Sequence, residues 1–332
     1  MTKKYKVFGI GNALVDMEFE VSESFLNDNK VEKGLMTLVE RERQVELLNS
    51  LDGIQHKRSC GGSAANTIIA GAQLGANNYY SCKVASDETG EFYYKDMKEI
   101  GVHSNIENAR FDGETGKCMV LITPDADRTM NTFLGITSTY SREEIIPDEL
   151  VDSEWLYIEG YLVTGPGSKD AAIFARETAQ KNDVKVALTF SDPGIVAHFK
   201  DGFKEIMGES KLDLIFCNEA EALSFTEKES LDEAMVEMKK YTRAFAITTG
   251  PKGAVIWDGN DVTYVLTNKV DAVDTNGAGD LFAGSFLYAI TNGYSFGEAG
   301  RFACGCSSKL VTQFGARLKS DQINAIKSQY LS

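Results

Sequence analysis

Short apolar runs alternate with longer amphipathic segments along most of the chain. Runs with strand-like composition are "YKVFGIG" (5–11), "WLYIEGYL" (155–162), "VKVALTF" (184–190), "LDLIFC" (212–217) and "AFAITTG" (244–250). Nearly continuous apolar character is typical of strands that are buried on both faces of a sheet. We therefore expect these runs to form the interior strands of one sheet.

Helical patterns lie between the strands, with their apolar residues on one face. They include "AANTIIAGAQLG" (64–75), "DAAIFARETAQKN" (170–182) and "LDEAMVEMKKYT" (231–242). Strands alternating with amphipathic helices predict βαβ units, and hence an α/β fold with a mostly parallel sheet covered on both faces. Ligands of such sheets bind at the carboxyl ends of the strands.

Two segments break this rhythm. Residues 14–40 and 115–135 alternate apolar and polar positions, as half-exposed strands or hairpins do. One interpretation is a small β-strand lid inserted into the main domain. The other is an antiparallel extension of the main sheet that has no functional motion.

Composition narrows the class of protein. The chain has 332 residues, of which 43% are hydrophobic and 25% charged, so it is expected to be globular. A formal net charge of -15 disfavours nucleic acid and anionic membranes as partners, because the chain has no basic surplus. Six scattered cysteines without a CxxC pair predict buried thiols in a reducing compartment. With no 18-residue apolar run and no signal-like start, a cytoplasmic location is expected.

The stretch "DAVDTNGAGDLFAGSFLYAI" (271–290) carries the strongest chemical signal. A turn of Gly277, Ala278 and Gly279 leads into a helix, where free backbone N–H groups and the helix dipole favour an anion. Asp280 follows and could accept a proton from an attacking hydroxyl, a combination that suggests phosphoryl transfer. Alternatively, Asp280 only caps the helix.

Two further polar motifs lie early in the chain. In "GNALVD", Asn12 and Asp16 follow the first strand, and a carboxylate there could hold a diol or simply face solvent. In "CGGSAANTI", Gly61, Gly62 and Asn66 lie at a turn that enters a helix. This turn could face the polar part of a substrate, or it could serve close helix packing.

Two motifs follow later strands. In "CNEAEAL", Asn218 and Glu221 match a capping box, while Glu221 could instead lie near Mg²⁺ or its waters. "TTGPKGAV" (248–255) either cradles the phosphates or sugar of a nucleotide or forms an ordinary hairpin turn.

The predicted lid offers a cation and apolar surface. Arg128 could close over developing phosphate charge or form an exposed salt bridge. Tyr161 could stack on a flat base, covered by apolar lid side chains, unless these only pack the lid. The apolar candidates are Leu14, Met36, Met119 and Phe133.

Other chemistries have little support. "GIGNAL" (9–14) is an incomplete dinucleotide fingerprint, no GxxxxGK[ST] is present, and the three histidines lack metal-ligand spacing. A dehydrogenase, a P-loop enzyme and a zinc enzyme are therefore disfavoured.

Taken in order, "GNALVD", "CGGSAANT", "DRTMNT", "NEAE", "TTGPKG" and "DTNGAGD" resemble the ribokinase or PfkB family of carbohydrate and nucleoside kinases. "GIGNALVD", "TGKC" and "YIEGYLVT" resemble its adenosine kinase branch more than ribokinase. The resemblance implies a single kinase domain over 1–332, with a Rossmann-like αβα architecture and a β lid. It also implies ATP-dependent transfer to a primary hydroxyl.

The resemblance also implies residue roles. Asp280 would be the general base, and the N–H groups of 277–279 the anion hole. Asn12, Asp16, Gly62 and Asn66 would hold sugar hydroxyls. The nucleotide and Mg²⁺ would be served by Asn218, Glu221 and the turn that contains Thr249, Gly250 and Gly253. A monovalent cation such as K⁺ would use backbone near Asp274 and Asn276.

The acceptor is less well defined than the reaction. We expect a nucleoside, adenosine first, with ribose, fructose or 2-keto-3-deoxygluconate as alternatives. A catalytically silent protein that binds a nucleoside or sugar is the rival class, and an intact "GAGD" argues against it. We expect a small-molecule acceptor as partner, and a monomer or homodimer.

Overall fold

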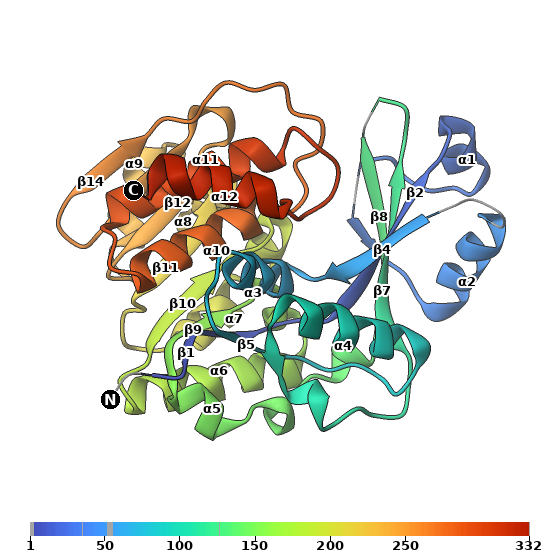
Figure 1. Ribbon diagram of the computed structural model, residues 1–332, viewed down its shortest axis with the longest axis horizontal. Helices are drawn as coiled ribbons and strands as arrows, with labels where there is room; N and C mark the ends of the chain where they lie inside the picture. Colours follow the sequence, from blue (N-terminus) through green and yellow to red (C-terminus); the bar gives the residue numbers. More distant parts are fainter. Residues whose placement is uncertain (1–2, 35, 52–55, 126, 332) are drawn as a thin grey trace.

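The computed structural model describes residues 3–331, apart from 35, 52–55 and 126. A large sheet flanked by helices carries a separate small sheet at one side, to the right in Figure 1. The expected α/β class is confirmed.

The large sheet has nine strands. Their order is β14 (Val262–Val265), β13 (Ala254–Trp257), β12 (Phe245–Thr248), β11 (Leu214–Asn218), β10 (Lys185–Thr189), β9 (Ser153–Ile158), β1 (Tyr5–Ile10), β5 (Asn78–Ser81) and β6 (His103–Ser104). All neighbours pair in parallel except at β13 and β14, which form an antiparallel edge. The sheet is therefore mostly parallel, as the alternating pattern predicts.

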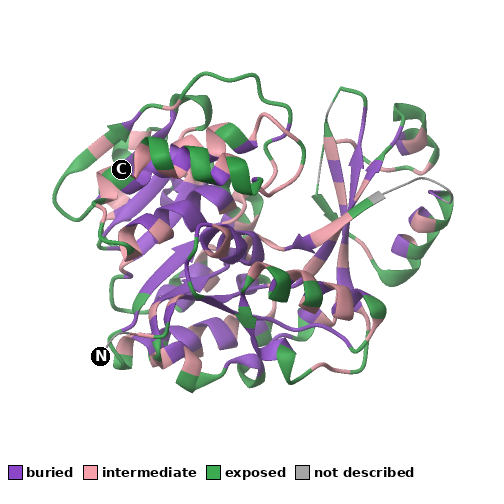
Figure 2. Cartoon of the chain, in the orientation of Figure 1, coloured by how far each residue is buried: buried purple, intermediate pink, exposed green. Residues whose placement is uncertain are grey.

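Helices cover both faces of this sheet, and each face has its own apolar core. One layer holds α3 (Ser63–Gln73), α4 (Glu88–Ile100), α10 (Ala278–Thr291), α11 (Phe296–Leu310) and α12 (Ser320–Tyr330). The other layer holds α5 (Pro147–Val151), α6 (Pro166–Lys181), α7 (Pro193–Met207), α8 (Glu219–Thr226) and α9 (Leu231–Met238). Short 3-10 turns are Asn105–Glu107, Ile136–Thr139, Arg142–Glu144, Gly160–Thr164 and Gly250–Lys252. Figure 2 shows buried residues concentrated on the strands and on the helix faces toward them.

One predicted strand is too long. The run 155–162 leaves the sheet after Ile158 and enters the 3-10 turn Gly160–Thr164. A Cβ at Gly160 would lie 2.5 Å from the Thr189 carbonyl oxygen, so the chain passes directly over the end of β10 there. Local β propensity did not reveal this close approach.

The small sheet has the order β3 (Met36–Leu38), β8 (Arg128–Gly135), β7 (Thr115–Ile122), β2 (Leu14–Glu20) and β4 (His56–Gly61). Helices α1 (Glu23–Asp28) and α2 (Arg41–Ser50) lie on its far side from the large sheet (Figure 1). The strands within 14–40 and 115–135 thus form a separate lid, and the alternative of an extended main sheet is wrong. Strand β4 was missed because "HKRSCG" lacks an alternating apolar pattern.

All six cysteines are free and buried, as expected. Within the part of the chain that the structure describes, no helix combines the length and apolar character needed to cross a membrane.

Candidate active site

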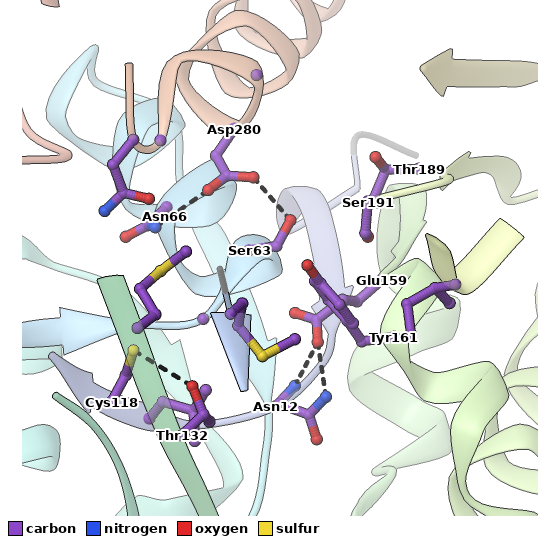
Figure 3. Close-up of a pocket in the computed structure, with 18 of the residues that line it drawn as sticks. Asn12, Ser63, Asn66, Cys118, Thr132, Glu159, Tyr161, Thr189, Ser191 and Asp280 are labelled. Carbon is purple, nitrogen blue, oxygen red and sulfur yellow. Dashed lines mark hydrogen bonds between the residues drawn. The ribbon is translucent and has the colours of Figure 1, made fainter. Parts of the chain in front are cut away.

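A cleft of about 400 Å³ lies between the lid and the carboxyl ends of the central strands (Figure 3). Asn12 follows β1, Glu159 follows β9, and Thr189, Asn218 and Thr248 end the next three strands in the sheet order. The site therefore lies at the carboxyl ends of parallel strands, where ligands bind in this architecture.

Asp280 lies at the end of this cleft that α10 forms. Helix α10 has Gly277 as its N-cap, and Asp280, in the first turn, makes no capping hydrogen bond. Its Oδ1 accepts from Ser63 Oγ at 2.7 Å and its Oδ2 from Asn66 Nδ2 at 3.1 Å (Figure 3). The capping interpretation of Asp280 is therefore wrong, because its carboxylate contacts a different helix.

Close packing of α3 on α10 brings these partners together. A Cβ at Gly284 of α10 would lie 2.3 Å from the Thr67 carbonyl oxygen of α3, so only glycine permits this approach. The packing places the first turns of both helices side by side. Ser63 and Asn66 consequently both lie within hydrogen-bonding distance of Asp280.

Burial controls the proton affinity of this carboxylate. Removal from water raises the pKa of Asp280 to about 6, and the hydrogen bonds from Ser63 and Asn66 act in the opposite direction. The group is therefore mostly ionised at pH 7, yet it holds a proton more readily than an ordinary aspartate. Both properties suit a general base.

The turn before α10 has a backbone conformation that requires glycine at position 277. Gly277 has a φ of 72°, and a Cβ there would lie 2.6 Å from the Ala316 Cβ. Gly277 and Gly279 both line the cleft. Ala278 N–H already donates to Thr275 O at 3.2 Å. This turn thus brings backbone close to Asp280, at the positive end of the helix dipole.

Glu159 is a site residue that the sequence interpretation missed. It is 1% exposed, and its Oε1 accepts from Asn12 N at 3.2 Å and from Asn12 Nδ2 at 2.8 Å. Its Oε2 accepts from Ala64 N at 2.8 Å, at the start of α3. Burial raises the pKa of Glu159 to about 7. The available signal was an acid directly after the apolar strand "WLYI".

Asp16 and Asn12 both line the cleft, as does Gly62. Burial, reinforced by the charge of Glu18, raises the pKa of Asp16 to about 7. A Cβ at Gly61 would lie 2.3 Å from the Asp16 carboxyl group. Strand β4 can therefore pair beside Asp16 only because Gly61 has no side chain.

Asn218 and Glu221 form the expected capping box at the start of α8. Glu221 Oε2 accepts from Asn218 N at 2.9 Å, and its Oε1 accepts from Asn218 Nδ2 at 2.8 Å. Both residues also line the cleft, and burial raises the pKa of Glu221 to about 7. The capping interpretation is confirmed, and the predicted Mg²⁺ role stays a prediction.

The turn of Thr249, Gly250 and Gly253 joins the antiparallel strands β12 and β13. It is a hairpin turn, as one interpretation expected, and none of these three residues lines the cleft, although Thr248 does. Their role toward a nucleotide stays a prediction.

The lid contributes an apolar surface to the cleft, but two of the four lid residues predicted to line the cleft do not line it. Leu14 and Met36 line the cleft, whereas Met119 is fully buried in the core and Phe133 lies outside the cleft. Successive side chains of a strand point to opposite faces, so their neighbours take these places. The lining residues of β7 and β8 are Cys118, Val120, Met130, Thr132 and Leu134.

Tyr161 lines the cleft opposite the lid, as expected. Arg128 does not line it. Its Nη2 lies 2.6 Å from Asp274 Oδ2 in a pair whose side chains are 8% and 1% exposed. The expected exposed salt bridge is therefore wrong, since the pair is buried. Asn276, the second residue assigned to a monovalent cation, lines the cleft.

Comparison with known proteins identifies the family. The profile of the pfkB family carbohydrate kinases matches residues 35–323. Adenosine kinase 1 of Arabidopsis thaliana is 27% identical over 335 residues, covering 93% of this chain and 94% of that protein.

Two solved structures are similar over almost the whole chain. A probable sugar kinase from Rhizobium etli CFN 42 is 32% identical with a TM-score of 0.91, covering 99% of this chain and 100% of that chain. Adenosine kinase from Sinorhizobium meliloti is 33% identical with a TM-score of 0.89, covering 98% of this chain and 99% of that chain.

Proposed function

The chain belongs to the pfkB family of carbohydrate kinases and is an ATP-dependent phosphotransferase, and we propose that it phosphorylates the primary hydroxyl of a nucleoside, adenosine first. The observation that carries the proposal is that a single cleft contains an apolar lid surface, polar side chains that can bind sugar hydroxyls, and Asp280. The residues assigned below act as a set.

Asp280 is the general base. Its ionised carboxylate takes the proton of the acceptor hydroxyl as the oxygen attacks the phosphoryl group. Ser63 and Asn66 orient it, since each donates to a different carboxylate oxygen. The backbone N–H groups of Gly277 and Gly279, which line the cleft, stabilise the negative charge on the transferred group, and Ala278 N–H joins them by exchanging its hydrogen bond to Thr275 O.

Polar groups beside Asp280 hold the sugar. Asn66 Oδ1 is buried without a hydrogen-bond partner among the described residues, so it can accept from an acceptor hydroxyl. Asp16 accepts from two hydroxyls of a diol, and Asn12 and Gly62 complete this part of the cleft. Glu159 keeps Asn12 in place.

The nucleobase of the acceptor lies between Tyr161 and the lid. Met36 and Leu38 are 36% and 58% exposed although both line the cleft, so apolar surface is available to cover a flat ring. A bare sugar would leave most of this surface in contact with water. This favours a nucleoside over ribose or fructose.

The donor side of the cleft suits ATP with Mg²⁺. Within the described residues no cluster of three His, Cys, Asp or Glu side chains could hold a metal by itself. This agrees with Mg²⁺ that is held mainly by phosphates and water, with Glu221 near its waters. Asn218 and the turn of Thr249, Gly250 and Gly253 serve the nucleotide. Bound Mg²⁺ would neutralise phosphate charge, and K⁺ at the backbone of Asp274 and Asn276 remains part of the proposal.

A sugar kinase is the second candidate, favoured by the 32% identity to the probable sugar kinase. A coupled assay of ADP release across adenosine, inosine, ribose, fructose and 2-keto-3-deoxygluconate separates the two. Efficient turnover of a sugar with none of either nucleoside would overturn the nucleoside assignment and leave the kinase intact. A cytoplasmic location and a monomer or homodimer also remain our expectations.

A further inference from the structure

The lid meets the main domain at a second place, outside the cleft lining. Arg128 lies at the start of β8, and its guanidinium reaches the loop before α10. There it pairs with Asp274, whose side chain is 1% exposed. Arg128 belongs to the small sheet of the lid, whereas Asp274 lies in the main domain, in the loop before α10. The pair is therefore a direct link between the lid and the catalytic turn.

Asp274 uses its carboxylate to join further segments. Its Oδ1 accepts from Asn276 N at 2.9 Å, within the turn that leads to Gly277. Its Oδ2 accepts from Gly315 N at 2.9 Å, in the loop after α11. One buried carboxylate therefore connects the lid, the turn before Asp280 and the loop after α11.

The loop after α11 also supports the turn by packing. Ala316 occupies the space where a Cβ of Gly277 would lie. Next to it, Phe314 is 49% exposed, and its ring centre lies 6.0 Å from the Arg128 guanidinium. Glu18 of β2 is a longer-range partner, 3.5 Å from Arg128 Nη1.

The ion pair couples the position of the lid to the conformation of the turn before α10. Removing one partner of a buried ion pair is strongly unfavourable, because the other charge stays buried without compensation. If the lid moved away with Arg128, the buried Asp274 side chain would lose its ion-pair partner. The ordered turn and the seated lid therefore stabilise each other.

We propose that Arg128 and Asp274 are positioning residues for phosphoryl transfer: their ion pair holds the turn 274–277 in register with Asp280 when the lid is seated. This rests on the proposed anion-hole role of 277–279. Arg128 then acts through Asp274, in place of a direct contact with the phosphoryl group. The coupling makes lid seating and assembly of the anion hole one event.

A double-mutant cycle tests this. Arg128→Met and Asp274→Asn are each expected to lower kcat on the order of 10- to 100-fold, because small misplacements of catalytic groups have effects of this size. The double variant should be no slower than the slower single variant, since both changes break one interaction. The cycle uses whichever acceptor the wild-type enzyme phosphorylates.

Amide hydrogen exchange supplies a readout that needs no acceptor. In both variants the 273–279 segment should exchange faster than in wild type, while β9 and β10 keep their protection. Arg58→Met is the matched control, because Arg58 of β4 also joins the lid to the main domain, through an exposed pair with Glu88 of α4. It should leave kcat and the exchange of 273–279 unchanged.

Three outcomes would overturn the proposal. If Arg128→Met is slow while Asp274→Asn keeps wild-type kcat, Arg128 contacts the substrate directly. Unchanged exchange at 273–279 would show that the pair does not order the turn. Faster exchange with unchanged kcat would show that the ordered turn has no catalytic role, which would also remove the anion hole from the proposed function. If Asp274→Asn fails to fold, Arg128→Lys, which keeps the charge, must retain more activity than Arg128→Met.

Discussion

Asp280 Oδ2 and Asn66 Nδ2 lie 3.1 Å apart, although 214 positions separate the two residues in the chain. Asn66 lies in the first turn of α3 and Asp280 in the first turn of α10. The hydrogen bond fixes one carboxylate oxygen, and Ser63 fixes the other. The proposed general base is therefore oriented before any ligand binds, which lowers the entropy to be lost on reaching the reactive geometry.

Replacing Asp280 by Asn should leave the fold and ligand binding nearly intact and lower kcat by roughly 10²–10⁴-fold, since an amide cannot accept the proton. Steady-state kinetics and the melting temperature check this together. Wild-type turnover in the variant, under conditions where chemistry limits the rate, would refute the base assignment.

The rate should depend on pH through the same group. Because burial raises the pKa of Asp280 to about 6, the active ionised form is lost as the pH falls through 6. We expect kcat/KM to be flat above pH 7 and to fall about tenfold per pH unit well below 6. A profile that stays flat down to pH 5 would contradict this, provided that the enzyme remains folded there.

Stability should depend on pH in the direction opposite to that of a salt-bridged acid. Burial raises the pKa values of Asp16, Glu159 and Glu221 to about 7, so the folded state binds these protons more tightly than the unfolded state does. Ionising them therefore lowers the free energy of unfolding as the pH rises from about 4.5 to 7. Acids with lowered pKa, such as Asp87 and Asp96, are already ionised in this window.

Melting temperatures measured between pH 4.5 and 7.5, without ligand, check this expectation. Asp16→Asn removes one partly buried charge and should raise the melting temperature at pH 7.5 while flattening the pH dependence. A melting temperature that rises steadily with pH in the wild-type protein would show that other groups dominate.

Asp16→Asn should weaken the acceptor far more than ATP. A carboxylate accepts from both hydroxyls of a diol, whereas an amide offers a single acceptor oxygen. KM values for both substrates give the comparison, with Arg58→Met as a lid variant that should change neither. Equal losses for the two substrates would indicate a general structural defect.

Tyr161→Ala should lower the affinity for adenosine by about 10-fold or more, because an aromatic stack on a base contributes on the order of 1–3 kcal/mol. Activity toward ribose, if any is present, should barely change. Direct binding measurements with adenosine test the contact, and unchanged affinity would mean that Tyr161 only packs the wall of the cleft.

The sequence by itself determined the class of fold, the five central strands and the position of Asp280 after a glycine turn. These features are local, since buried strands, amphipathic helices and capping boxes leave their pattern within a few residues. The match of "DTNGAGD" in order with the other motifs also fixed the expected family. The lid strands in 14–40 and 115–135 were visible for the same reason.

Tertiary structure alone decided how these pieces contact one another. Whether Asp280 capped its own helix or met another depended on the packing of α3 on α10, which no local pattern encodes. The side of the small sheet on which Met119 and Phe133 lie depended on the strand register, because a shift of one residue exchanges the two faces of a strand. The contacts of Glu159 with Asn12, and of Arg128 with Asp274, join positions 147 and 146 residues apart in the sequence. Pairings between such distant residues arise only when the whole chain is folded.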